Sequence, residues 1–121
     1  MTKHTIQKSR SAKALEVRYR EYLCSLRRRD GSLFSKKYVY DKMSRFRLVL
    51  DLVGTRRLSD VSDSNFLNIL DVVVERLFTD PAMKSRRGRH ADYTVVVRQL
   101  YDMNNKKRAL RYTHYRGEKR N

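Results

Sequence analysis

The side chains of this sequence that are best suited to bind another molecule are its cations, 29 lysines and arginines against 13 acidic residues in a chain of 121. They gather in the two flanks, because residues 1–29 carry a net charge of +7 and residues 79–121 one of +8, whereas residues 30–78 carry +1. Self-repulsion of this size destabilises a compact domain unless a polyanion neutralises it. Double-stranded nucleic acid is the commonest polyanion, and a basic surface that is merely solvated is the alternative.

Residues that could hold a metal or carry out catalysis are few. The single cysteine, Cys24, has no histidine at a metal-ligand spacing. The three histidines lie in separate segments, at His4, His90 and His114. Asp60 and Asp63 could share a cation, but their positions favour capping and turn roles. The four glycines are not spaced as a phosphate-binding loop. The sequence therefore predicts no metal, no cofactor and no enzymatic activity.

Length and apolar content predict one intracellular domain with one modest core. No apolar run approaches roughly 18 residues, and residues 1–5 lack the apolar region of a signal peptide, so no membrane partner is predicted. One cysteine cannot form an internal disulfide, which suits a reducing cytosol. Because Cys24 adjoins the apolar stripe of the first predicted helix, we expect a buried thiol there. We expect a cytoplasmic, nucleoid-associated protein.

Apolar residues recur at helical spacing in four segments, which predicts an all-α fold, a compact bundle of four or five helices. The first helix follows Ser9 or Ser11 and ends at Asp30-Gly31. Its apolar stripe is Leu15, Tyr19, Tyr22, Leu23 and Leu26. The second begins at a Ser35 cap and ends at Gly54. Phe34 and Val39 are expected to form a hydrophobic staple at its start. Its apolar stripe is Val39, Met43, Phe46, Leu50 and Val53.

The third and fourth helices follow the same logic. Ser62 is predicted to cap the third, which ends at Thr79-Asp80-Pro81. Val61 and Phe66 are expected to form its hydrophobic staple. Its apolar stripe is Phe66, Ile69, Leu70, Val73 and Leu77. The basic stretch 84–89 is predicted to be a loop, and the fourth helix runs from about Ala91 to Asn104. The domain organisation is then a basic N-terminal arm, residues 1–8, a helical domain, residues 9–104, and a basic tail, residues 105–121.

Two groups of polar and basic residues stand away from the predicted apolar stripes. At about 100° per residue, Lys37, Ser44 and Arg45 lie on the outer side of the second helix, with Tyr40 at their flank. Thr94 and Arg98 point outward from the fourth helix. Three arginines precede its first turn, where free backbone amides favour phosphate: Arg86, Arg87 and Arg89. Acids are sparse around both groups, which favours phosphate contact.

The order of these segments over residues 9–104 resembles the N-terminal core-binding domain of phage integrases, the tyrosine recombinases. The matching stretches are residues 14–23 (ALEVRYREYL), residues 35–46 (SKKYVYDKMSRF), residues 58–67 (LSDVSDSNFL) and the Arg-Gly-Arg segment before residues 93–101 (YTVVVRQLY). The resemblance implies a SAM-like helical bundle that clamps one side of duplex DNA in DNA integration and recombination by a mobile element. Carried over by position, it implies DNA contacts from Lys36, Lys37, Tyr40, Ser44, Arg45, Arg86, Arg87, Arg89, Thr94 and Arg98.

The catalytic half of that family has no room in 121 residues. Tyr112, His114 and Tyr115 cluster near the C-terminus, but a tyrosine without a set of arginine and histidine partners is not an activated nucleophile. The expected protein is a DNA-binding module without its own catalytic domain, either a stand-alone relative or a piece of a longer recombinase.

Two other functions stay open at this point. The chain could be a small basic regulatory or anti-defence protein that binds RNA or a nucleoprotein complex. It could also be a nuclease or recombinase fragment with residual chemistry, which predicts metal-dependent nicking or a covalent DNA adduct. The sequence favours double-stranded DNA as the partner and makes no prediction of oligomeric state.

Overall fold

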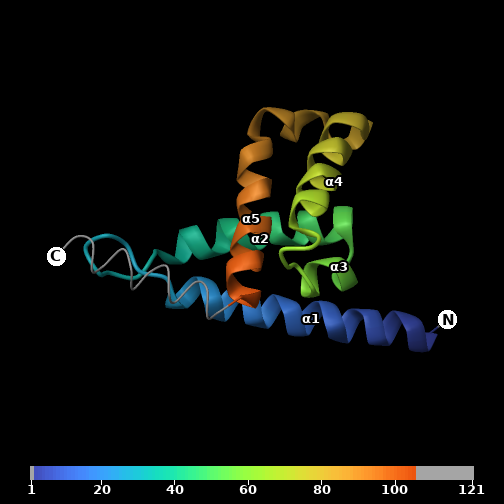
Figure 1. Cartoon of the computed structure of the whole chain (residues 1–121). Helices are drawn as coiled ribbons and strands as arrows, with labels where there is room; N and C mark the ends of the chain where they lie inside the picture. Colours follow the sequence, from blue (N-terminus) through green and yellow to red (C-terminus); the bar gives the residue numbers. More distant parts are fainter. Residues whose placement is uncertain (1, 106–121) are drawn as a thin grey trace.

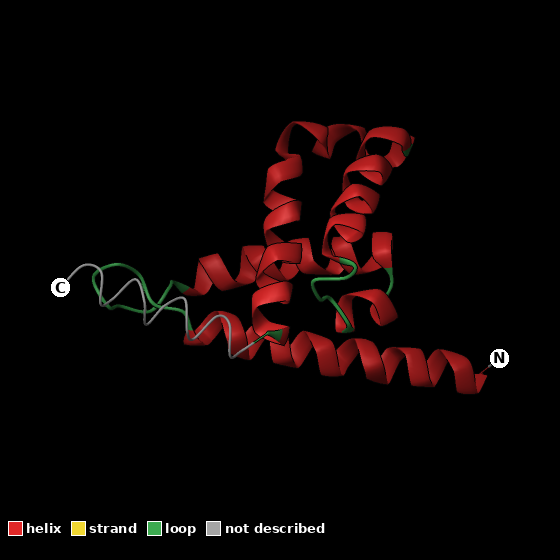
Figure 2. Ribbon diagram, viewed as in Figure 1, coloured by secondary structure: helices red, strands yellow, loops and turns green. Residues whose placement is uncertain are grey.

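Five α-helices and one 3-10 helix account for most of the part of the chain that the structure describes (Figure 2). The structure is a computed structural model that describes the backbone of residues 2–105 and the side chains of residues 11–105. The elements are α1 (Thr2–Ser25), α2 (Lys36–Val53), α3 (Thr55–Ser59), α4 (Phe66–Thr79), η1 (Pro81–Arg89, the 3-10 helix) and α5 (His90–Asn104). The predicted all-α fold is confirmed, and within residues 2–105 the only β-type pairing is one bridge between Arg27 and Leu33.

Two helical hairpins form the domain (Figure 1). Helices α1 and α2 run in opposite directions and are joined by residues 26–35. Helices α4 and α5 also run in opposite directions, joined by η1 at the end far from α1, and α3 links the two hairpins. Helix α5 packs against both α2 and α4 and also touches α1 and α3, so it is the element that holds the hairpins together.

The core lies where the hairpins meet. Tyr19 of α1 and Phe46 of α2 are fully buried, and their rings stack with centroids 5.0 Å apart. Helix α4 buries Ile69, Val73 and Leu77. Helix α5 buries Val96, Val97, Leu100 and Met103. The predicted stripe of α2 is confirmed at Met43 and Phe46, while its other members, Val39, Leu50 and Val53, pack at the edge of the core. No helix among the described residues combines the length and the apolar character needed to cross a membrane.

The predicted boundaries of α2 are confirmed by its caps. The Ser35 hydroxyl accepts the Tyr38 backbone N–H at 3.1 Å, which satisfies one of the unpaired amides of the first turn. Gly54 ends the helix with φ of +101°, a backbone conformation that residues with a side chain rarely adopt. The chain then enters α3, the additional helix.

Five local predictions are wrong. Helix α1 begins at Thr2, because no glycine or proline interrupts residues 2–25. It ends at Ser25 and not at Asp30-Gly31, because residues 27–33 form a turn closed by the bridge between Arg27 and Leu33. Helix α4 begins at Phe66 rather than after a Ser62 cap, because residues 62–65 form a separate turn in which the Asn65 side-chain oxygen accepts the Ser62 N–H. Residues 84–89 belong to η1 and not to a loop. Cys24 is exposed, because it lies one position beyond buried Leu23 on the helix.

The remaining predictions on the ends of the chain concern residues outside the described part. These are the tail from residue 106 onward, with Tyr112, His114 and Tyr115, and the side chain of His4. Asn105, the first residue of the predicted tail, is the C-cap of α5, as expected for the end of that helix.

Candidate nucleic-acid interface

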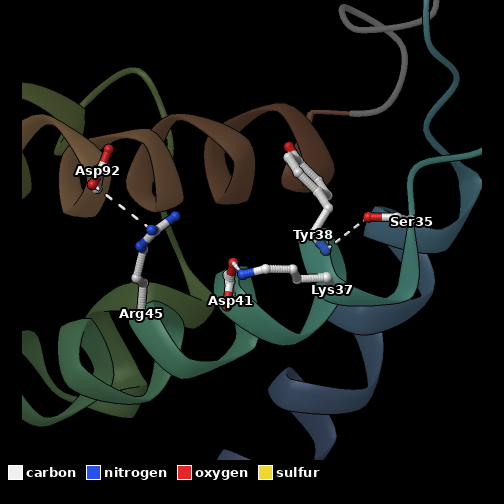
Figure 3. A network of polar contacts seen from close by, with 6 residues as sticks. All are labelled: Ser35, Lys37, Tyr38, Asp41, Arg45 and Asp92. Carbon is white, nitrogen blue, oxygen red and sulfur yellow. Dashed lines mark hydrogen bonds and ion pairs between the residues drawn. The ribbon is translucent and has the colours of Figure 1, made fainter.

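The predicted α2 residues are held in different ways. Lys36, Lys37, Tyr40 and Ser44 are exposed, and the Lys37 ammonium lies 3.5 Å from the Asp41 carboxylate one turn later (Figure 3). An exposed i, i+4 pair of this kind contributes only about 0.3–0.5 kcal/mol, so Lys37 is still free to move to a phosphate.

Arg45 is placed differently from its neighbours on α2. Its side chain is only 26% exposed, and its guanidinium lies 3.7 Å from the Asp92 carboxylate on α5 (Figure 3). The pair ties α2 to the first turn of α5. A second polar link lies about two turns further along α5, where Gln99 accepts from the Tyr19 hydroxyl at 2.7 Å and donates to the Tyr38 hydroxyl at 3.2 Å. The positive charge of Arg45 is therefore partly neutralised by the ion pair that joins the two helices.

Lys42 is a basic residue that the sequence did not single out. It is buried, with its ammonium 5.5 Å from the centre of the Tyr38 ring. Burial lowers the pKa of Lys42, and the Arg45 charge nearby lowers it further, against an opposite effect of Asp92. This lysine therefore belongs to the α2–α5 contact and is not available to a ligand.

The basic stretch before α5 contains cations with no partner. Lys84, Arg86 and Arg89 of η1 are exposed, and the structure gives their side chains no hydrogen bond or ion pair within the described residues. Arg98 is also exposed, and at about 100° per residue it lies opposite Val96 and Leu100, the buried side of α5. The Thr94 hydroxyl donates to the Ala91 carbonyl at 3.0 Å, so it stays along its own helix.

Arg87 points the other way. Its Nε donates to the Leu77 carbonyl at 2.8 Å, and a terminal nitrogen donates to the Asp80 carbonyl at 3.1 Å, both partly buried. These carbonyls belong to the C-terminal end of α4, where a cation is favoured by the helix dipole. Arg87 thus joins η1 to α4 and differs in role from Arg86 and Arg89, which the sequence does not distinguish from it.

The start of α5 is also unlike the prediction. Helix η1 runs directly into α5, and the His90 backbone N–H donates to the Arg87 carbonyl. The first amide of α5 is therefore already paired, so the expected set of free amides before this helix loses a member. The feature that could still attract an anion at this end of the second hairpin is the positive charge of the exposed side chains of η1.

The ten predicted residues are distributed over both hairpins, on α2 of the first and on η1 and α5 of the second. Lys36 and Tyr40 line a groove of about 600 Å³ that α2 shares with α1 and the 26–35 loop. Helix η1, with Arg86 and Arg89, lies at the end of the second hairpin that is far from α1 (Figure 1). Sequence reasoning missed Lys84 as a site residue, although it stands in the same basic run. It also missed Arg20 and Arg47, which line the groove from two helices.

The carboxylates of the domain are arranged for structure. In the described residues no three His, Cys, Asp or Glu side chains come together as a metal site. The Asp63 carboxylate accepts a hydrogen bond from the Tyr101 hydroxyl on α5, which is a contact between distant segments and not a cap. The Asp60 backbone carbonyl accepts from the Asn65 side chain within the turn before α4.

Neither protein-family models nor curated proteins nor solved structures gave a match to this chain. The resemblance to the integrase core-binding domain therefore rests on the sequence motifs alone.

Proposed function

We propose that this protein binds double-stranded DNA through the basic η1–α5 segment, by which we mean Lys84, Arg86, Arg89 and Arg98. The observation that carries the proposal is the imbalance of charge in this segment. Its four cations are exposed and have no partner among the described residues, while Asp80 and Asp92, the two carboxylates that flank η1 in the sequence, are occupied. Asp80 accepts the Ala82 N–H at 2.9 Å, and Asp92 pairs with Arg45.

Unpaired guanidinium groups on a rigid element suit phosphate. Arginine presents planar donors that match phosphate oxygens, and each phosphate that it neutralises releases a counterion from the duplex. Arg86 and Arg89 are held on η1, which Arg87 fastens to α4. The donors are therefore carried by a helical support, which lowers the conformational entropy that binding must remove.

The resemblance to the integrase core-binding domain supports the same partner. It also suggests that the protein acts in DNA integration or recombination as a module that grips duplex DNA while a catalytic unit acts elsewhere. Phosphate contacts position a protein without reading sequence, so the binding we propose is directed at the backbone. Arg98 is the residue of the segment that is placed on a helix face and could also reach a base edge.

The test compares two double variants that each remove two exposed arginines. Arg86→Ala with Arg89→Ala changes the proposed surface. Arg56→Ala with Arg57→Ala changes α3, whose two arginines are also exposed and have no partner in the part of the chain that the structure describes. Fluorescence anisotropy with a labelled duplex should show a loss of affinity of about tenfold or more in the first variant and a much smaller loss in the second. Equal losses would mean that only total charge matters. Tighter binding to duplex RNA than to DNA of the same sequence would favour the RNA-binding alternative.

A further inference from the structure

A concave site lies on the first hairpin, and its lining shares no residue with the basic η1–α5 segment. It is a groove of about 600 Å³ between the second half of α1, the 26–35 loop and the part of α2 from Lys36 to Arg47. Its lining includes Arg20, Cys24, Phe34, Lys36, Tyr40 and Arg47. A volume of this size is typical of sites that enclose a small organic group. We propose that this groove binds unpaired nucleotides of a single-stranded nucleic acid.

The rim of the groove carries positive charge. Arg20, Lys36 and Arg47 line it, and among the described residues no acidic side chain does. Glu16 stands beside it and is shared by two guanidiniums, 3.4 Å from Arg47 and 3.9 Å from Arg20. One carboxylate cannot neutralise two arginines and a lysine, so the rim keeps an excess of positive charge. Glu16 also orients both guanidiniums, which leaves donors free for phosphate oxygens.

The groove also offers an aromatic ring. Tyr40 is 64% exposed, a high value for a ring of its size, and makes no ring contact in the described structure. Phe34 lines the groove as well, but its ring already stacks on Tyr38 with centroids 4.2 Å apart and has the Arg28 guanidinium 5.5 Å from its centre, so Tyr40 is the ring that is open to a base. Exposed aromatic faces next to cations are the combination that binds single strands, since every base can stack and every nucleotide carries a phosphate.

The combination of features selects this ligand over two others. In a duplex the base faces are covered by their neighbours, so a duplex could use the cations but not the ring of Tyr40. An acidic peptide could likewise satisfy the charge but would leave the apolar lining, which includes half-exposed Leu33, without a matching group. The groove shares no residue with the basic η1–α5 segment, so this inference does not rest on duplex binding. It assigns Lys36 and Tyr40 to a different ligand from the one that the integrase resemblance implies.

The protein contains its own reporter for this site. Cys24 is the only cysteine, it is exposed, and it lines the groove. Its rate of alkylation by N-ethylmaleimide, a neutral reagent, should fall at least about fivefold when oligothymidylate of about ten nucleotides is added at saturation. An oligomer of equal length that has abasic sugars but the same phosphates should leave the rate nearly unchanged. No protection by oligothymidylate, or equal protection by the abasic oligomer or by polyglutamate, would overturn the inference.

Variants test the stacking directly. Tyr40→Ala should raise the oligothymidylate concentration needed for half-protection by about tenfold, and Tyr40→Phe should leave it unchanged, because the ring is what stacks. Leu67→Ala on α4 is the matched control for loss of an exposed apolar side chain, since Leu67 is 71% exposed. Far-UV circular dichroism checks that each variant is folded. If oligothymidylate protects Cys24 in Tyr40→Ala at the same concentration as in the unaltered protein, the ring takes no part in binding and the inference fails.

The two proposals fail separately. A duplex with closed ends should leave the alkylation rate of Cys24 unchanged, and Arg86→Ala with Arg89→Ala should weaken duplex binding without changing protection by oligothymidylate. If the duplex slows alkylation as strongly as the single strand, the groove is part of the duplex surface and the single-strand inference is wrong. If no duplex binds at any site while oligothymidylate protects Cys24, duplex binding is wrong and the groove inference stands.

Discussion

Replacing Arg87 by alanine should destabilise the fold, whereas replacing its neighbours Arg86 and Arg89 should not. Arg87 donates two hydrogen bonds, at 2.8 and 3.1 Å, to backbone carbonyls at the end of α4. Its loss removes both hydrogen bonds, takes the side-chain donor from the partly buried Leu77 carbonyl, and removes a cation from the C-terminal end of a helix, while the Asp80 carbonyl keeps the Met83 N–H at 2.9 Å.

The size of the effect follows from these contacts. A hydrogen bond from a charged donor contributes about 1.5 kcal/mol or more when buried, and partial exposure lowers this to about 1 kcal/mol each. The helix-dipole effect adds about 0.3–1 kcal/mol. The sum is about 2 to 3 kcal/mol, which corresponds to a fall of about 5–15 °C in the melting temperature of a domain of this size.

Thermal unfolding followed by circular dichroism at 222 nm measures the change. Arg86→Ala is the matched control, because Arg86 is exposed and has no partner among the described residues, so its stability should stay within about 0.5 kcal/mol of the unaltered protein. Equal melting temperatures for the two variants would refute the structural role of Arg87. It would then rejoin Arg86 and Arg89 as a candidate for phosphate contact.

Three further predictions concern the core, the pH and a turn. Phe46→Ala should lower the free energy of unfolding in urea by about 3–5 kcal/mol, because the ring is fully buried, while Leu67→Ala should change it by less than about 0.5 kcal/mol. Burial raises the pKa of Tyr19 above its usual range and that of Tyr22 to about 12, so both phenols ionise more readily when unfolded. The contribution of the two neutral phenols to the free energy of unfolding is then fully present below about pH 10 and should be lost as the pH rises from about 10.5 to 12. An unchanged urea midpoint over this range would contradict this prediction. Gly54→Ala should lower the free energy of unfolding by about 1–3 kcal/mol in the same assay, because φ is +101° at this position. An added methyl group would meet no atom within 4 Å, so the loss would come from backbone strain and not from a clash.

The parts of this fold that could be predicted from sequence are those set by local chemistry. A serine cap and a glycine stop frame α2, and both effects act within one turn of the chain. Apolar spacing likewise located the buried faces of α1 and α4. Helix η1 was missed because its residues have no apolar period, although Asp80 as a cap followed by Pro81 in the first turn was a readable start signal.

The roles of individual cations could not be predicted, because they depend on contacts between distant segments. Arg86 and Arg87 are neighbours in the sequence, yet only Arg87 reaches the α4 carbonyls, ten residues back along the chain. Arg45 looked like an exposed cation until α5 supplied Asp92. The groove is built from Arg20 on one helix and Arg47 on another, and no local pattern joins them.

The dependence of duplex affinity on salt concentration tests the central claim most directly, because it counts the phosphates that the protein neutralises. If the four cations of the basic η1–α5 segment each contact one phosphate, the slope of log affinity against log salt is about −3.6 or steeper. Arg86→Ala with Arg89→Ala should make this slope shallower by about 1.8. Arg56→Ala with Arg57→Ala should leave the slope unchanged. A slope near zero for the unaltered protein, or the same slope in both double variants, would contradict DNA binding through this segment.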